Sequence, residues 1–123
     1  MARCPCGSAG YASCCEPCHT GLNAPDALVL MRSRYSAYAL KRADYLIATW
    51  HCSTRPATLD LAGDASRWLG LEIKRYTKQS EDYATVEFVA RYKVAGRAHR
   101  LHELSRFVRE DGRWFYVDGD FLA

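Results

Sequence analysis

Residues 86–94 read Val-Glu-Phe-Val-Ala-Arg-Tyr-Lys-Val, and this stretch decides the fold. Its apolar side chains recur at every second position from Val86 to Val94, and a period of two places them on one face of a β-strand. Similar alternation marks three other runs: residues 69–73, 99–109 and 114–118. The second half of the chain therefore predicts a sheet with one apolar face.

Short polar segments separate these four runs. Residues 79–82 read Gln-Ser-Glu-Asp, residues 95–97 read Ala-Gly-Arg, and residues 110–113 read Glu-Asp-Gly-Arg. An Asp-Gly pair between two strand-like runs is the strongest short-range sign of a β-hairpin. We therefore expect an antiparallel sheet of four strands in which neighbours along the chain also pair in the sheet.

The residues before the sheet follow a helical period. Pro25 suits the first turn of a helix, and the carboxylate of Asp26 complements the positive end of its dipole. Apolar residues then recur at steps of three and four and form one stripe: Leu28, Met31, Tyr35, Tyr38 and Ala39. Because this stripe needs an apolar partner, we expect the helix to pack on the apolar face of the sheet.

Two shorter helices are predicted after it. Asp44 can cap a helix from Tyr45 to about Trp50, and a third helical segment is expected around Ala57–Leu61. Helices followed by an antiparallel sheet indicate an α+β fold.

Length and composition limit the classes of function. The chain has 123 residues, which is enough for one substantial core, and its net charge of +3 is too small to indicate nucleic-acid binding. No apolar run approaches the length of a membrane span, and the cysteine-rich start lacks the apolar core of a signal peptide. We therefore expect a cytoplasmic protein without a membrane partner. In that compartment, cysteines serve metal or redox chemistry more often than structural disulfides.

Five of the six cysteines lie within the first nineteen residues. The pairs Cys4/Cys6 and Cys14/Cys15 each supply two sulfurs, with seven residues between the pairs. Four thiolates suit Zn²⁺ in a closed, structural site. This segment has few large apolar side chains, so a bound metal would supply folding free energy. Thiol redox chemistry or a regulatory disulfide is the alternative, and an iron–sulfur centre is a further one.

The residues of this segment resemble a known motif. Cys4-Pro-Cys6-Gly-Ser, followed by Tyr11 and Cys14-Cys15, is similar to the SEC-C zinc knuckle found at the C-terminus of the SecA translocase. That knuckle usually has eight residues between its second and third cysteines, and this chain has seven. The shorter loop leaves the fourth ligand open between Cys15 and the nearby donors Cys18 and His19.

The rest of the chain resembles the YchJ family. The resemblance is carried by five segments: Leu-Met-Arg-Ser-Arg-Tyr-Ser-Ala-Tyr at 30–38, Asp-Tyr-Leu at 44–46, Thr-Trp-His at 49–51, Ser-Arg-Phe at 105–107 and Gly-Arg-Trp-Phe-Tyr-Val-Asp-Gly at 112–119. The family joins a SEC-C knuckle to a cone similar to nuclear transport factor 2. The resemblance implies a knuckle over residues 1–22 and a cone of helices on a curved antiparallel sheet over residues 23–123.

Cones of this kind enclose a pocket between the helices and the concave face of the sheet. Glu103, Ser105 and Phe107 share one strand face, so if Phe107 is in the core then Glu103 points inward as well. A buried carboxylate needs a partner, and Arg32 or Arg34 is the partner by type. The alternatives are a Glu–Arg pair that ties helix to sheet and an acid that acts on a ligand. Candidate pocket residues are Arg32, Arg34, Tyr35, Trp50, Glu103, Ser105 and Tyr116.

Cys52 next to His51 is the one candidate nucleophile pair. Adjacent side chains rarely face each other, so a partly buried thiol without catalytic work is the better interpretation of Cys52.

These observations favour a non-catalytic zinc-binding module. The resemblance to the SecA knuckle, which serves as a docking piece, implies a protein or ribosome-associated partner. Two alternatives remain open. One is an enzyme for a small molecule that uses the cone pocket, with Glu103 as acid or base. The other is a thiol redox sensor built from the N-terminal cysteines.

Overall fold

A computed structural model describes residues 3–7, 10–61 and 66–122. The helices come first and the strands follow, in this order: η1 Tyr11–Ser13, α1 Glu16–His19, α2 Ala27–Ala39, α3 Ala43–Ala48, β1 Arg67–Lys78, β2 Tyr83–Val94, β3 Arg97–Glu110 and β4 Arg113–Phe121.

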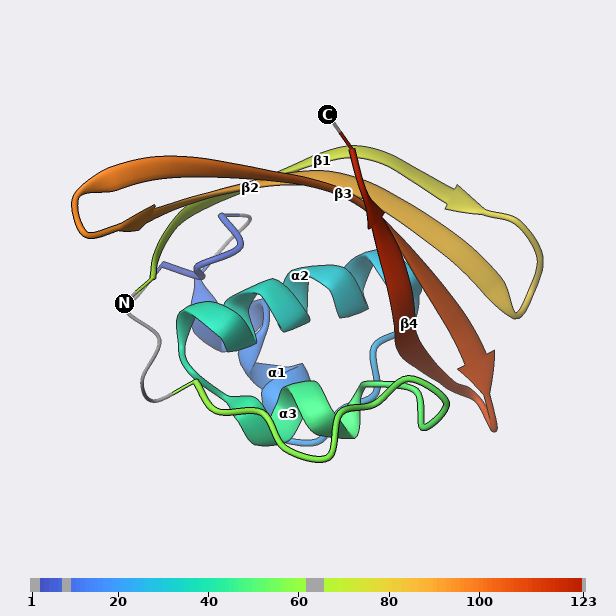
Figure 1. Cartoon of the computed structure of the whole chain (residues 1–123). Coiled ribbons are helices and arrows are strands. Elements are labelled where there is room, and N and C mark those ends of the chain that lie inside the picture. Colours follow the sequence, from blue (N-terminus) through green and yellow to red (C-terminus); the bar gives the residue numbers. More distant parts are fainter. Residues whose placement is uncertain (1–2, 8–9, 62–65, 123) are drawn as a thin grey trace.

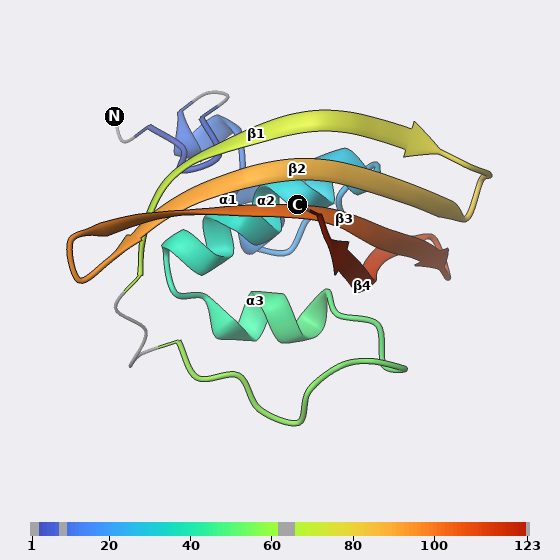
Figure 2. The same ribbon diagram turned by 45° about the horizontal axis from the view of Figure 1, so that its top comes forward.

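The four strands form an antiparallel sheet in the order β1-β2-β3-β4, as the sequence predicts. Figures 1 and 2 show this sheet curving over α2, with α1 and α3 on the opposite side of α2. The α+β fold is therefore confirmed, and α2 is its central helix. No helix among the described residues has the length and apolar character needed to cross a membrane.

Two tight turns fix the register of the sheet. Ala95 and Gly96 join β2 to β3 with φ values of 51° and 79°, and Asp111 and Gly112 join β3 to β4 with φ values of 51° and 76°. Two consecutive positive φ values are typical of a type I′ turn, whose twist matches that of the paired strands. The predicted Asp-Gly hairpin is therefore confirmed.

We predict that Ala95→Asn stabilises the protein by about 0.5–1 kcal/mol, because alanine is disfavoured at positive φ and Asn-Gly is the preferred pair in this turn. Urea denaturation of the variant measures the change. Ala98→Asn, on an exposed position of β3, is the control. Equal stability of the two variants would contradict the prediction.

Helix α2 begins after Asp26, whose side chain accepts a hydrogen bond from the backbone N–H of Val29 at 2.8 Å. The predicted stripe is too narrow, because burial extends to polar positions of the helix: Ser33, Arg34 and Ser36. The sheet covers one side of α2, and α1 and α3 contact other sides. Polar side chains there must find partners inside the protein.

The shorter helices differ from expectation. Helix α3 begins at Ala43, so Asp44 lies in its first turn and does not cap it. The helix predicted around Ala57–Leu61 is wrong, because this segment has no regular secondary structure. Its apolar residues instead reach a small core around Ala37 and Leu46, in which Leu61 is buried and Leu59 packs at the edge.

The backbone after α3 pairs with β4. The N–H of His51 donates to the carbonyl of Tyr116 at 2.8 Å, and the N–H of Tyr116 donates to the carbonyl of Thr49 at 2.9 Å. These bonds fix the end of α3 against the sheet and bring Trp50 beside Tyr116.

The N-terminal segment shares the main core. Cys4, Cys6 and Cys15 belong to the same buried cluster as Leu30 of α2 and residues of the sheet. The division of the chain at residues 22 and 23 stays a prediction.

Candidate functional site

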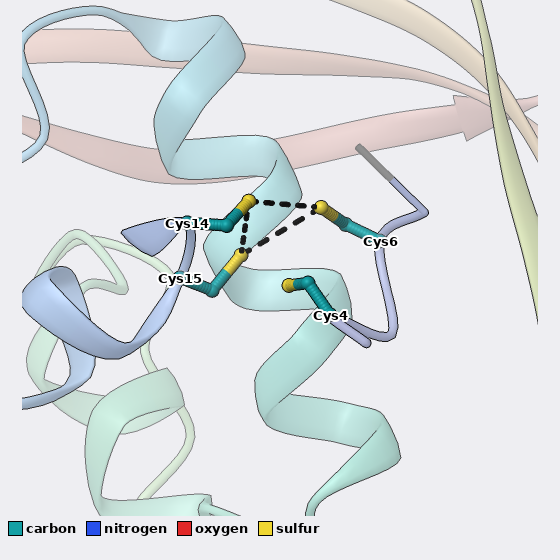
Figure 3. A group of neighbouring side chains, drawn as sticks. All are labelled: Cys4, Cys6, Cys14 and Cys15. Atoms are coloured by element: carbon teal, nitrogen blue, oxygen red, sulfur yellow. Dashed lines mark hydrogen bonds between the residues drawn. The ribbon is translucent and has the colours of Figure 1, made fainter. Parts of the chain in front are cut away.

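Four thiols converge at the N-terminal end of the chain. The sulfur atoms of Cys4, Cys6, Cys14 and Cys15 all lie within 4.8 Å of one another. Figure 3 shows them at the surface of α2, with Cys4 and Cys6 on one loop and Cys14 and Cys15 on the segment that leads into α1. The first two and Cys15 are 2% exposed, and Cys14 is half-buried.

The sulfur–sulfur distances fit a single bound ion. Cys6 lies 3.4 Å from Cys14, and Cys15 lies 3.8 Å from both of them. Four sulfurs bound to Zn²⁺ at about 2.3 Å would be separated by about 3.8 Å in a tetrahedron. A disulfide would bring two sulfurs to about 2.05 Å, and none joins any of the six cysteines. The arrangement is therefore able to hold a metal ion.

Helix α2 supports the thiols through Ser36. Its hydroxyl donates to the sulfur of Cys15 at 3.2 Å and lies 3.4 Å from the sulfur of Cys4. The hydrogen bond to Cys6, together with burial, raises the pKa of the Cys15 thiol. Four thiolates crowded in a buried site repel one another, so their joint ionisation requires a cation among them.

Cys18 and His19 lie outside this group of sulfurs. The ring of His19 is occupied on both sides: Nδ1 lies 2.7 Å from the hydroxyl of Tyr11, and Nε2 lies 2.8 Å from the carbonyl of Ser33. Since a carbonyl can only accept, Nε2 carries the proton and Nδ1 accepts from Tyr11. Burial lowers the pKa of His19, which agrees with a neutral ring. This histidine ties η1 and α1 to α2.

We predict that His19→Gln lowers the free energy of unfolding by about 2 kcal/mol and leaves metal content unchanged, because it breaks two hydrogen bonds and touches no thiol of the group. Urea denaturation and metal analysis on the same sample test both parts. His99→Gln, on an exposed position of β3, is the control. Loss of metal from His19→Gln would contradict the prediction and identify His19 as a ligand. Loss of metal from Cys18→Ala would identify Cys18 as a ligand in the same way.

A second candidate site lies between α2 and the concave face of the sheet. It is a cavity of about 350 Å³. Arg34, Glu103 and Ser105 supply charged and polar groups, and the remaining wall is aromatic and apolar: Met31, Tyr35, Tyr38, Trp68, Phe88, Ala90, Leu101, Tyr116 and Phe121.

Arg34 is 3% exposed and is held by α3 and β4. One of its terminal nitrogens donates to the carbonyl of Leu46 at 2.9 Å and to the hydroxyl of Thr49 at 2.7 Å. Its guanidinium lies 5.1 Å from the ring of Trp50 and 4.6 Å from the ring of Tyr116. Burial lowers the pKa of Arg34, and nearby tyrosines and Glu103 oppose that shift. Arg34 stays charged all the same, because a guanidinium does not deprotonate in proteins.

Glu103 is 9% exposed, and among the described residues it accepts hydrogen bonds on one oxygen. Oε2 accepts from the hydroxyl of Ser105 and, at 3.3 Å, from the hydroxyl of Tyr116. Among the described residues, no cation lies within ion-pair distance of Glu103, so the expected Glu–Arg pair is absent there. Tyr116 stands between the two charges, with its hydroxyl on Glu103 and its ring under Arg34.

Five of the seven predicted pocket residues line the cavity, and two do not. Arg34, Tyr35, Glu103, Ser105 and Tyr116 line the cavity. Trp50 contacts Arg34 but does not line the cavity, and Arg32 does not line the cavity either.

The adjacent pair at the end of α3 does not form a catalytic couple. Both nitrogens of His51 are engaged, with Glu110 at 2.7 Å and Ser53 at 2.7 Å. Cys52 is exposed, so its interpretation as a partly buried thiol is wrong.

Two residues of these sites escaped the sequence analysis. Ser36 is a polar residue inside a buried helix, and such a residue must bond within the protein. A Cβ atom on Gly119 would overlap Oε2 of Glu103, so the glycine makes room for the carboxylate. A glycine inside a strand pattern is the signal that could have identified it.

Comparison with known proteins agrees with this architecture. The family described as "YchJ, middle NTF2-like domain" matches residues 26–119. A UPF0225 protein of Methylibium petroleiphilum is 58% identical over 118 residues, which cover 95% of this chain and 87% of the relative. A UPF0225 protein of Ralstonia nicotianae is 57% identical over 131 residues, which cover 97% and 91%.

Two solved structures share the whole fold. The solution structure of a SEC-C motif containing protein from Rhodopseudomonas palustris has a TM-score of 0.86 at 34% identity and covers 98% of both chains. The crystal structure of a SEC-C motif containing protein from Psychrobacter arcticus has a TM-score of 0.80 at 30% identity and covers 98% of this chain and 82% of that one.

The fold and the four-thiol site thus define a protein with a SEC-C-type cysteine cluster joined to a nuclear transport factor 2-like domain. The chain belongs to the YchJ (UPF0225) family.

Proposed function

We propose that the chain is a non-catalytic zinc-binding module that docks to a partner. The convergence of four sulfurs within 4.8 Å of one another is the observation that carries the zinc proposal. Cys4, Cys6, Cys14 and Cys15 would hold the ion, and Zn²⁺ is the ion that four thiolates in this geometry favour.

The role of this zinc is structural. Four protein ligands leave no coordination position for water or substrate. The thiols are also part of the core against α2, where Ser36 bonds to two of them. A bound ion would therefore fasten the first loop and α1 to the central helix and supply part of the folding free energy.

We predict about one zinc per chain in protein purified without chelator. Cys14→Ser should lose the metal and on the order of 4 kcal/mol of stability, because the remaining thiols no longer close the site. Cys52→Ser, at an exposed position outside the group, is the matched control and should keep both. Metal analysis and urea denaturation give the two readings.

The same samples distinguish the zinc-binding module from a thiol redox sensor. A sensor would purify without metal and form a disulfide among these four cysteines reversibly under a mild oxidant. That result would contradict the zinc proposal.

The docking part of the proposal draws on a basic group on the outer face of the sheet. Arg91 lies directly opposite Arg100 on β3, and Lys93 lies directly opposite Arg67 on β1. All four are exposed, and like charges in opposed positions destabilise a sheet. Among the described residues, Glu72 is the acid in ion-pair contact with this group, through Arg91 at 3.5 Å.

An acidic partner surface would offset this repulsion. The proposed partner is therefore a protein or ribosome-associated component with an acidic contact surface, and the basic group would guide the encounter.

We predict that the protein sediments with purified bacterial ribosomes at low salt and much less at high salt, because screening weakens charge attraction. Arg91→Glu combined with Arg100→Glu should reduce the sedimenting fraction several-fold. Arg55→Glu combined with Lys78→Glu changes the net charge equally at exposed positions elsewhere and should have little effect. Absence of sedimentation at low salt, or equal loss in both double variants, would contradict this proposal.

A further inference from the structure

The cavity beneath the sheet has no part in the zinc and docking proposals, yet it contains two buried charges of opposite sign. Proteins rarely bury charged side chains without pairing them, because removing a charge from water is costly. Arg34 and Glu103 both line this cavity and are not in ion-pair contact with each other. Each therefore has room for a partner of opposite charge inside the cavity.

Glu103 shows more clearly than Arg34 that a partner can bind in the cavity. Its hydrogen bonds come from two neutral hydroxyls and end on the same oxygen, Oε2. Among the described residues, Oε1 has no hydrogen-bond donor. A carboxylate in this state can accept an N–H group, and a cationic N–H group would also neutralise its charge.

The position of this carboxylate is built into the sheet. Gly119 lies opposite Ser105 in the pairing of β3 with β4, and a side chain there would displace Oε2 of Glu103. Ser105 and Tyr116 then fix the carboxylate from two further sides. The acid is thus held in one place beside the cavity.

Arg34 supplies the opposite charge. Its bonds to Leu46 and Thr49 hold one terminal nitrogen, its side chain also bonds to Tyr38, and two aromatic rings cover the guanidinium. In the part of the chain that the structure describes, no carboxylate lies within ion-pair distance of this group. Arginine carries further N–H donors that can bind a carboxylate.

The rest of the wall fits an apolar body. Trp68, Phe88, Tyr35 and Met31 line the cavity, and its volume of about 350 Å³ is at the small end of the range for ligand pockets. A molecule with a single charge would leave either Arg34 or Glu103 unpaired in this surrounding. A molecule with both charges pairs both.

We propose that the cavity binds a small zwitterionic organic molecule of the amino-acid class. Its ammonium group contacts Oε1 of Glu103, its carboxylate lies toward Arg34, and its apolar part packs against Trp68 and Phe88.

Three probes that share one phenyl ring test the charge requirement by calorimetric titration of the full chain: L-phenylalanine, 2-phenylethylamine and 3-phenylpropionate. Phenylalanine should bind at least about tenfold more tightly than the other two, because one lost charge-assisted contact costs about that factor. No binding of phenylalanine, or binding no tighter than that of the singly charged probes, would overturn the proposal.

Variants locate the site. Glu103→Gln keeps the shape of the side chain and should weaken phenylalanine and phenylethylamine about tenfold or more while leaving phenylpropionate unchanged. Gly119→Ala should weaken phenylalanine without changing the charge of the chain. Glu110→Gln, at the exposed end of the same strand, is the matched control. Unchanged phenylalanine affinity in both Glu103→Gln and Gly119→Ala, with thermal unfolding showing folded protein, would also overturn the proposal.

Discussion

The buried guanidinium of Arg34 is the interaction on which the arrangement of the layers depends. It starts from the central helix, bonds to the last turn of α3 through Leu46 and Thr49, and lies against the rings of Trp50 and Tyr116. Two consecutive helices and the last strand of the sheet meet at this one side chain. Carbonyl groups at the end of a helix favour a cation, so the position suits arginine electrostatically as well. Replacing it with a neutral residue would remove this donor from the carbonyl of Leu46 and the hydroxyl of Thr49.

The two sites lie on different sides of the same helix. Ser36 contacts the thiols, while Arg34 and Tyr35 line the cavity beneath the sheet. A helix that contacts a sheet, a cysteine cluster and a second helix layer has little surface left for water, which explains its buried serines. The cluster also replaces apolar side chains that a segment this short cannot supply.

Much of the fold follows from local signals. The alternation in residues 86–94 reflects the pleat of a strand, and the Asp111-Gly112 pair reflects the twist that a hairpin turn must match. Both signals act over a few residues, so the order of the strands in the sheet could be predicted. The helix expected at residues 57–61 is absent, because a segment of five residues is too short for its periodicity to identify a helix. Leu61 and Leu59 instead pack against the small core from an irregular backbone. The breadth of burial on α2 could not be predicted, since it depends on which distant elements cover the helix.

In the two sites as well, features set by local sequence could be predicted and features set by tertiary contacts could not. The inward position of Glu103 follows from its phase with Phe107 on one strand. The sequence does not show that Arg34, and not Arg32, lines the cavity. Both arginines lie near the edge of the apolar stripe, and only the tertiary contacts of α3 and β4 distinguish them. The roles of Ser36 and Gly119 likewise depend on groups brought close by folding.

Four consecutive residues of α2 each meet a different neighbour. The carbonyl of Ser33 accepts from His19, Arg34 reaches the end of α3, Tyr35 packs edge-on against Trp68, and Ser36 bonds to the cysteines. Each step along a helix turns the side chain by about 100°. Inserting or deleting one residue within this turn would therefore misdirect every later contact at once. This turn of α2 should therefore tolerate no change in length.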